Sequence, residues 1–178
     1  MEITIRNGKL EEINIAYDLL RNAATWLRDK NIDYWQNWHN PPAAHIEWIK
    51  NGFANGEFFF VYGNENMLVG MYRLQYSDDM FWGKRDDKAG YIHSLTTNRE
   101  LRGQGIGYLI LSAIERELSA KGFEYLRLDC SADVEGLCKY YEKFGFMPKE
   151  IITHIYGEKL RLYEKKINMN YQPESHTT

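Results

Sequence analysis

The order in which strand-like and helix-like stretches follow one another limits most strongly how this chain can fold. Apolar residues alternate with polar ones around Ile3 and Ile5, a pattern typical of a strand. From Leu10 to Leu27 they recur every three or four residues, a pattern typical of an amphipathic helix. Continued to residue 167, such patterns give the order β-α-α-β-β-β-α-β-α-β-β, which predicts an α/β layer fold with a mixed sheet of about seven strands flanked by four helices. The predicted strands cover about 3–5, 57–62, 66–76, 89–97, 125–130, 151–156 and 159–167, and the predicted helices about 10–27, 40–52, 105–121 and 134–144.

A length of 178 residues is typical of one domain, which we place at residues 1–167 and follow with a polar tail at 168–178. The net charge of −3 provides no basic field for nucleic acid, and the apolar runs are too short to span a membrane. The first residues lack the pattern of a secretory signal. Cys130 and Cys138 have neither a CxxC spacing nor a set of metal-ligating partners. We therefore expect a cytoplasmic protein with reduced thiols and no metal, which binds neither nucleic acid nor a membrane.

Three glycines lie in the turn that opens the predicted helix at 105–121: Gly103, Gly105 and Gly107. Glycine costs stability inside an element, so either the turn is very tight or a ligand approaches the backbone. The spacing does not match a dinucleotide-binding G-x-G-x-x-G, because Tyr108 replaces the third glycine, and no lysine follows for a P-loop. It matches Q/R-x-x-G-x-G/A, in which free N–H groups at a helix start form an anion site for a pyrophosphate. A tight turn without a ligand is the alternative.

Two segments then resemble one known family. Residues 92–111, "IHSLTTNRELRGQGIGYLIL", look like the strand, loop and acetyl-CoA-binding helix of the GNAT family, the Gcn-five-related N-acetyltransferases. Residues 126–146, "LRLDCSADVEGLCKYYEKFGF", are similar to the strand and helix that follow in that family, where the helix ends in a pattern like L-Y-E-K-x-G-F. The predicted order of elements also fits the family over residues 2–166. The resemblance implies a single-domain GNAT-like fold and acetyl transfer to an amine. The residues that match the second pattern are Tyr141, Glu142, Lys143, Gly145 and Phe146.

The resemblance also implies that acetyl-CoA is the cosubstrate and that main-chain groups hold much of it. Leu95 and Thr97 are expected to present main-chain groups to the pantetheine arm and the acetyl carbonyl. The family often has an asparagine that contacts pantetheine seven residues before the tyrosine, and this chain has Val134 there. The backbone amides expected to hold the pyrophosphate are those of Arg102, Gly103, Gln104, Gly105, Ile106 and Gly107.

Tyr141 is the expected general acid. In the family a tyrosine at this place protonates the CoA sulfur as it leaves. A phenol, with a pKa of about 10, stays protonated at neutral pH and can donate as thiolate charge develops. The register with Gly145 and Phe146 favours Tyr141 over its neighbour Tyr140. The alternative is that Tyr141 only packs its helix against the core.

His93 is the expected general base. An ammonium group must lose a proton before it attacks, and imidazole accepts protons near neutral pH. His93 stands two residues before Leu95, so in a regular strand both side chains lie on one face. A buried, structural histidine is the alternative. A covalent acetyl intermediate on Cys130 is a rival mechanism, although no histidine lies near that cysteine in the sequence.

The acceptor is the part of the function that the sequence predicts least. In the family, the first two helices and their connection help to form the acceptor site. Asp33, Trp35 and Trp38 fall in that connection, where an acidic group and aromatic rings suit a cationic amine, and packing of the rings is the alternative. We expect an acetyl-CoA-dependent N-acetyltransferase of a small-molecule or peptide amine, with a homodimer also open. The competing hypothesis is a non-catalytic acyl-CoA-binding sensor or scaffold.

Overall fold

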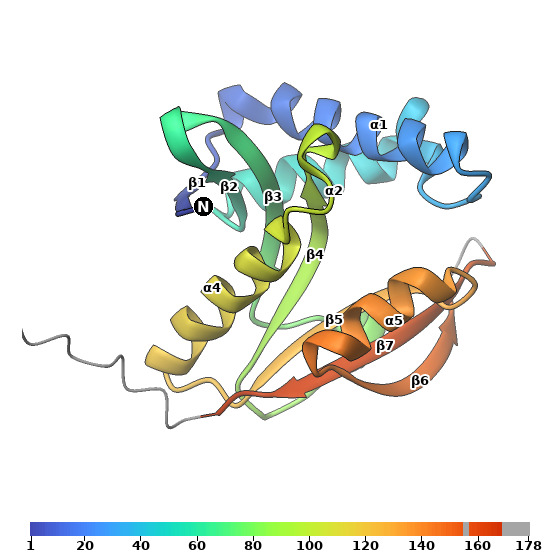
Figure 1. Ribbon diagram of the computed structural model, residues 1–178. Coiled ribbons are helices and arrows are strands. Elements are labelled where there is room, and N and C mark those ends of the chain that lie inside the picture. The colour runs from blue at the N-terminus through green and yellow to red at the C-terminus, as the bar shows by residue number, and fades with distance from the viewer. Residues whose placement is uncertain (155–156, 169–178) are drawn as a thin grey trace, which may run out of the picture.

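The computed structural model describes residues 1–154 and 157–168, which form one seven-stranded sheet with helices on both faces (Figure 1). The strand order in the sheet is β1-β2-β3-β4-β5-β7-β6, and β4 and β5 are the parallel pair among otherwise antiparallel neighbours. The strands are β1 (Thr4–Asn7), β2 (Phe58–Tyr62), β3 (Leu68–Gln75), β4 (Ala89–Thr97), β5 (Tyr125–Ser131), β6 (Met147–Thr153) and β7 (Lys159–Lys166). The helices are α1 (Ile13–Asp29), α2 (Ala43–Ala54), α3 (Asp79–Trp82), α4 (Ile106–Ala120) and α5 (Glu135–Phe144).

The predicted order of elements and the mixed sheet are confirmed, with one additional helix. The charged segment between β3 and β4, expected as a loop, contains the single turn α3. Asp78 produces that turn, because its carboxylate accepts a hydrogen bond from the N–H of Phe81 at 3.3 Å and so caps the helix start. The predicted tail at 168–178 lies, apart from Asn168, outside the described residues.

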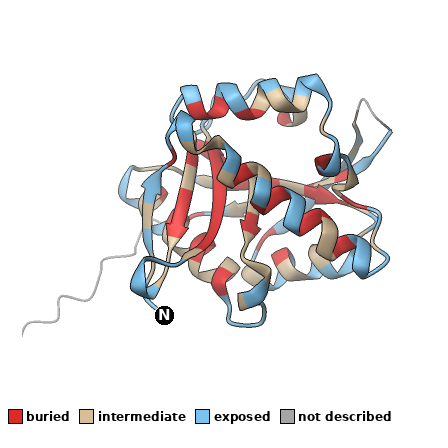
Figure 2. Ribbon diagram, turned by 90° about the horizontal axis from the view of Figure 1, so that it is seen from above, coloured by how far each residue is buried: buried red, intermediate tan, exposed pale blue. Residues whose placement is uncertain are grey.

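The two larger hydrophobic cores lie on opposite faces of the sheet. Side chains of α4 and α5, among them Ile110, Ile114 and Cys138, pack on one face against Tyr72 and Leu128. Side chains of α1 and α2 pack on the other face with those of β2 and β3. Figure 2 shows these buried residues on the central strands and on the inner side of the covering helices. No helix in residues 1–154 and 157–168 has the length and apolarity needed to cross a membrane.

Strand β4 is irregular in two ways near its C-terminal end. Its pairing with β5 runs from Ala89↔Tyr125 to Ile92↔Leu128, so residues 93–97 extend beyond the pairing. Its pairing with β3 shifts by one residue next to Ser94, whose φ is +51°. This is a β-bulge, which bends a strand and redirects its side chains. The β5 side of residues 93–97 therefore has no strand pairing with β5 in the described part of the chain, at the centre of the sheet.

Candidate active site

The glycine turn lies at the start of α4, as expected from the sequence. Gly103 and Gly105 have φ of +78° and +72°, and an added Cβ at either would meet open space. Left-handed backbone favours glycine at both positions, and Gly105 is the residue that caps α4. The first N–H groups of a helix have no acceptor within it, so the turn presents a set of donors and the positive end of the helix dipole. Such a turn can hold a pyrophosphate.

Gly107 has a different reason to be glycine. It lies inside α4, where a Cβ would collide with the hydroxyl oxygen of Tyr140 on α5. The hydroxyl of Tyr108 donates to the carbonyl oxygen of Tyr140 at 3.0 Å, and the two rings lie 4.6 Å apart between centroids. The hydroxyl of Tyr140 therefore occupies the space beside Gly107, which accounts for a glycine at this position. This contact joins the start of α4 to α5.

Tyr141, one residue further, is buried on the inner side of α5. Its side chain is 7% exposed, and its ring lies 5.9 Å from that of Phe146 and 6.2 Å from that of Tyr163. Burial raises the pKa of its phenol, and the nearby groups of Cys130, Tyr140 and Asp129 raise it further. The phenol therefore stays protonated across the physiological range, as a general acid requires.

The remaining cofactor residues predicted from the sequence lie at the end of β4 and in the turn before α4. Thr97 pairs with Gly70 of β3, and Leu95 packs against the core on the α4 and α5 face. Both lie in the part of β4 that extends beyond its pairing with β5. Arg102 and Gln104 lie in the exposed turn, and Val134 caps α5 without a side-chain hydrogen bond.

The bulge corrects the expected neighbour of His93. Across the pair, His93 lies opposite Arg73 and Thr96 lies opposite Met71, so His93 and Thr96 share one face of β4. Leu95 lies on the other face, with the α4 and α5 core. The expectation that His93 and Leu95 share a face is wrong, because the extra residue in the bulge reverses the alternation. His93 belongs to the α1 and α2 face.

Two carboxylates flank the His93 imidazole on that face. Nε2 lies 3.4 Å from Oδ2 of Asp78, and Nδ1 lies 3.7 Å from Oδ1 of Asp129. The ring centroid lies 5.8 Å from that of Trp48 and 6.0 Å from that of Phe81. The side chains of His93, Asp78 and Asp129 are 9%, 6% and 14% exposed. The three groups are buried close together, and Nε2 of His93 and Oδ2 of Asp78 have no hydrogen-bond partner among the described residues.

Sequence reasoning missed Asp129 as a site residue, and also Asp78 and Tyr34. Burial raises the pKa of Asp129 to about 6, while His93 lowers it and Asp78 raises it. Burial also raises the pKa of Tyr34, and the charge of Asp129 contributes to that rise. The signal for Asp129 is its place at the end of β5, where the parallel pair separates, whereas Asp78 carries no signal in the sequence. Tyr34 lies beside the residues that were chosen.

The three predicted acceptor residues have different environments. Trp38 is 8% exposed in the core under α1 and α2, with its ring 5.4 Å from that of His45, so packing accounts for it. Trp35 is partly buried against the same core and lies 5.5 Å from the Tyr34 ring. Asp33 is exposed, and its charge contributes to a raised pKa of Glu158, for which burial is the main cause. The charge of Asp129 thus acts on both Tyr34 and Glu158.

Cys130 has no support as a nucleophile. It is 1% exposed, and its sulfur lies 3.9 Å from the sulfur of Cys138. Burial raises the pKa of the Cys130 thiol, and Cys138 raises it further, so little reactive thiolate forms. The geometry therefore favours direct transfer over an acetyl-cysteine intermediate.

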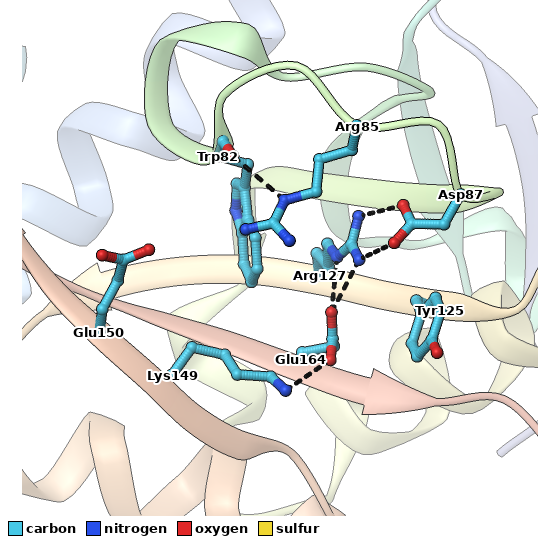
Figure 3. A pocket seen from close by; sticks show the side chains of 8 residues that line it. All are labelled: Trp82, Arg85, Asp87, Tyr125, Arg127, Lys149, Glu150 and Glu164. Carbon is cyan, nitrogen blue, oxygen red and sulfur yellow. Dashed lines mark hydrogen bonds and ion pairs between the residues drawn. The ribbon is translucent and has the colours of Figure 1, made fainter.

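A cavity of about 470 Å³ lies beside the other end of β5 (Figure 3). Figure 3 shows the Arg127 guanidinium between Asp87 and Glu164, with hydrogen bonds of 2.6 to 2.9 Å. Arg127 also donates to the hydroxyl of Tyr91 at 2.7 Å. Because the donors of this buried cation have acceptors, the network accounts for the charges without a ligand. We place the candidate site at the end of β5 instead.

Comparisons with known proteins agree with this fold. A family model described as acetyltransferase (GNAT) family matches residues 20–146. The uncharacterized N-acetyltransferase YesJ of Bacillus subtilis (strain 168) is 27% identical over 132 residues, 72% of each chain. An acetyltransferase of the GNAT family from Listeria monocytogenes 4b F2365 has a similar structure, with a TM-score of 0.73 and 22% identity over 93% of this chain and 95% of that one.

A further solved structure shows the same fold with the cofactor product bound. RimL, a ribosomal L7/L12 alpha-N-protein acetyltransferase in complex with coenzyme A, has a TM-score of 0.63 and 14% identity, over 94% of this chain and 96% of that one. The matched family segment spans β4, the glycine turn, α4, β5 and α5. The chain therefore belongs to the acetyltransferase (GNAT) family, and it is an acetyl-CoA-dependent acyltransferase.

Proposed function

We propose that this protein moves the acetyl group of acetyl-CoA directly to an amine of a small molecule or peptide. One observation carries the proposal. A buried, protonated phenol, Tyr141, and a buried acidic cluster around His93 lie on opposite faces of the sheet, at the place where β4 and β5 separate. The reaction needs a proton donor on the thiol side and a proton acceptor on the amine side.

The cofactor lies, in this proposal, on the α4 and α5 face. The amides of Gly103, Gly105, Ile106 and Gly107 and the helix dipole of α4 hold the pyrophosphate. The N–H groups of Arg102 and Gln104 already donate to the carbonyl oxygens of Arg99 and Leu101 at 3.3 and 3.4 Å. Main-chain groups of Leu95 and Thr97 hold the pantetheine arm, the sulfur of the thioester lies beside Tyr141 on the same face, and the acetyl group faces the gap in strand pairing. Bound there, acetyl-CoA supplies the acyl group, and Tyr141 donates a proton to the leaving sulfur.

The amine binds, in this proposal, on the α1 and α2 face. An ammonium group suits a surface with the carboxylates of Asp129 and Glu158, which lie near Tyr34. The cluster that contains His93 removes the proton, so that the nitrogen lone pair can attack the acetyl carbon. The transfer needs no intermediate on Cys130.

The test is release of free thiol from acetyl-CoA in the presence of a panel of amines, followed with a thiol-reactive dye. The panel contains aliphatic diamines, monoamines, amino acids and peptides with free N-termini. Release that depends on one class of amine, with a matching mass increase of that amine, supports the proposal. Tight binding of acetyl-CoA with no release for any amine would indicate the competing sensor or scaffold function.

A further inference from the structure

We propose that the carboxylate of Asp129 takes the proton from the acceptor amine, with His93 and Asp78 as the residues that position and tune it. The inference rests on the proposed function, because it assigns the proton acceptor of that same reaction. It changes the expected role of His93 from a group that contacts the amine to one that acts through Asp129.

The first argument is that both nitrogens of His93 already face carboxylates. Nε2 lies 3.4 Å from Oδ2 of Asp78, and both atoms are buried without a hydrogen bond among the described residues, while Nδ1 lies 3.7 Å from Oδ1 of Asp129. Asp78 is held in place because its other oxygen caps α3 through the N–H of Phe81. The rings of Trp48 and Phe81 lie near the imidazole. An acceptor amine therefore meets Asp129 before it meets a ring nitrogen.

The second argument is that Asp129 lies where the two sides of the site meet. Its side chain, 14% exposed, is the most accessible of the three. Its charge contributes to raised pKa values of Tyr141 on the cofactor side and of Tyr34 and Glu158 on the acceptor side. The titratable groups that act on Asp129 or respond to its charge come from separate elements: His93 of β4, Asp78 before α3, Tyr34 before the 3₁₀ turn at Gln36–His39, Cys130 of β5, Tyr141 of α5 and Glu158 before β7.

The proposed step balances without a further reactant. One proton moves from the ammonium nitrogen to a carboxylate oxygen of Asp129. The freed lone pair forms the C–N bond to the acetyl carbon, the C–S bond breaks, and the sulfur takes the phenolic proton of Tyr141. The acylated nitrogen then loses its second proton, which restores the phenol of Tyr141, and Asp129 releases its proton, so that the products are the amide, the free thiol of CoA and one proton in solution.

The environment of Asp129 suits this role. Burial raises the pKa of its carboxyl to about 6, so the group is ionised at neutral pH and yet a stronger base than an exposed aspartate. A charged His93 lowers that pKa, and the carboxylate of Asp78 raises it. His93 and Asp78 therefore shift the pKa of Asp129 in opposite directions, which makes the assignment testable.

The experiment is the pH dependence of kcat/KM for an amine that supports thiol release. In the wild type, kcat/KM should rise with pH through an inflection near 6, where Asp129 ionises. Asp129→Asn should remove that inflection and lower kcat/KM by about 10²-fold or more, the loss expected for a positioned base. Asp79→Asn, which alters an exposed aspartate next to Asp78, is the matched control and should keep the wild-type profile.

Two further variants give opposite shifts. His93→Gln should move the inflection to higher pH, because it removes the group that lowers the pKa of Asp129. Asp78→Asn should move it to lower pH, because it removes a charge that raises that pKa. These shifts decide the matter even if Asp129→Asn does not fold. Calorimetry with CoA, which binds on the other face, confirms that each variant is intact.

The outcomes separate the inference from the proposed function. If the wild type is active and His93→Gln removes the inflection, His93 is the base and the inference is overturned while the function stands. The same holds if Asp129→Asn stays within about threefold of the wild type. If the wild type releases no thiol with any amine, the proposed function fails and the inference falls with it.

Discussion

The two faces of the sheet are built in different ways. On the α4 and α5 face, the candidate cofactor groups are mostly main-chain groups of one continuous stretch, residues 95–107, with Tyr141 beside it. On the α1 and α2 face, the candidate acceptor groups are side chains from distant parts of the sequence, Tyr34, Asp78, His93 and Asp129. One face uses the geometry of a turn, and the other uses a cluster of charges.

This difference has a physical consequence. A turn that presents N–H groups depends on backbone angles, so it tolerates changes in most side chains and is sensitive to changes at its positive-φ glycines. A buried charge cluster depends on the identity of each member, because a lone buried charge is costly. Changes on the first face should therefore alter cofactor affinity, and changes on the second should alter pH dependence and choice of amine.

The largest effect is expected from Gly105→Glu. A carboxylate at the start of α4 would repel the pyrophosphate, and repulsion of several kcal/mol lowers CoA affinity by about 10³-fold. Gly122→Glu is the matched control, since Gly122 also has a positive φ, +74°, and open space around its Cβ, but lies at the other end of α4. Calorimetry measures both. Equal losses in the two variants would mean that strain, and not the anion site, explains the result.

The second-largest effect is expected from Tyr141→Phe. The ring still packs, so CoA affinity and KM should hold while kcat falls by about 10²-fold, the low end for loss of a general acid. Tyr140→Phe is the control, because its hydroxyl faces Gly107 and the start of α4. Its kcat should fall by less than about tenfold. A reversed order of the two variants would move the acid role to Tyr140.

A smaller effect is expected from Gly107→Ala, which tests the contact between α4 and α5. The new methyl group meets the Tyr140 hydroxyl, and such overpacking lowers the free energy of unfolding by about 1–3 kcal/mol. Urea unfolding measures the loss. In a double-mutant cycle, Gly107→Ala should cost less once Tyr140→Ala is present, because the clash is gone. Additive losses would show that Gly107 does not serve this contact.

The contrast between the two faces also explains which features could be predicted from the sequence. The order of elements and the glycine turn were predictable, because hydrophobic periodicity and glycine spacing are local properties. Tyr141 could be chosen because Gly145 ends its helix a fixed distance away. These predictions depend on residues that are close together in the sequence.

The acceptor face could not be predicted in the same way. The bulge at Ser94 reverses the alternation of β4, and no residue pattern announced it, so His93 was placed with the wrong neighbour. Asp78 comes close to His93 only because a single helical turn forms in a charged segment. Trp38 was a reasonable candidate by composition, but the fold uses its ring for packing. Each miss depends on contacts between distant segments.

The most direct test of the two-sided account is to map acetyl-CoA binding by amide chemical shifts in ¹⁵N-labelled protein. The account predicts large shifts for the amides of Gly103, Gly105 and Ile106, and for those at the end of β4. The amides of α2, under the acceptor face, should shift little. Large shifts along α2, with unchanged shifts in the glycine turn, would place the cofactor on the other face and contradict the account.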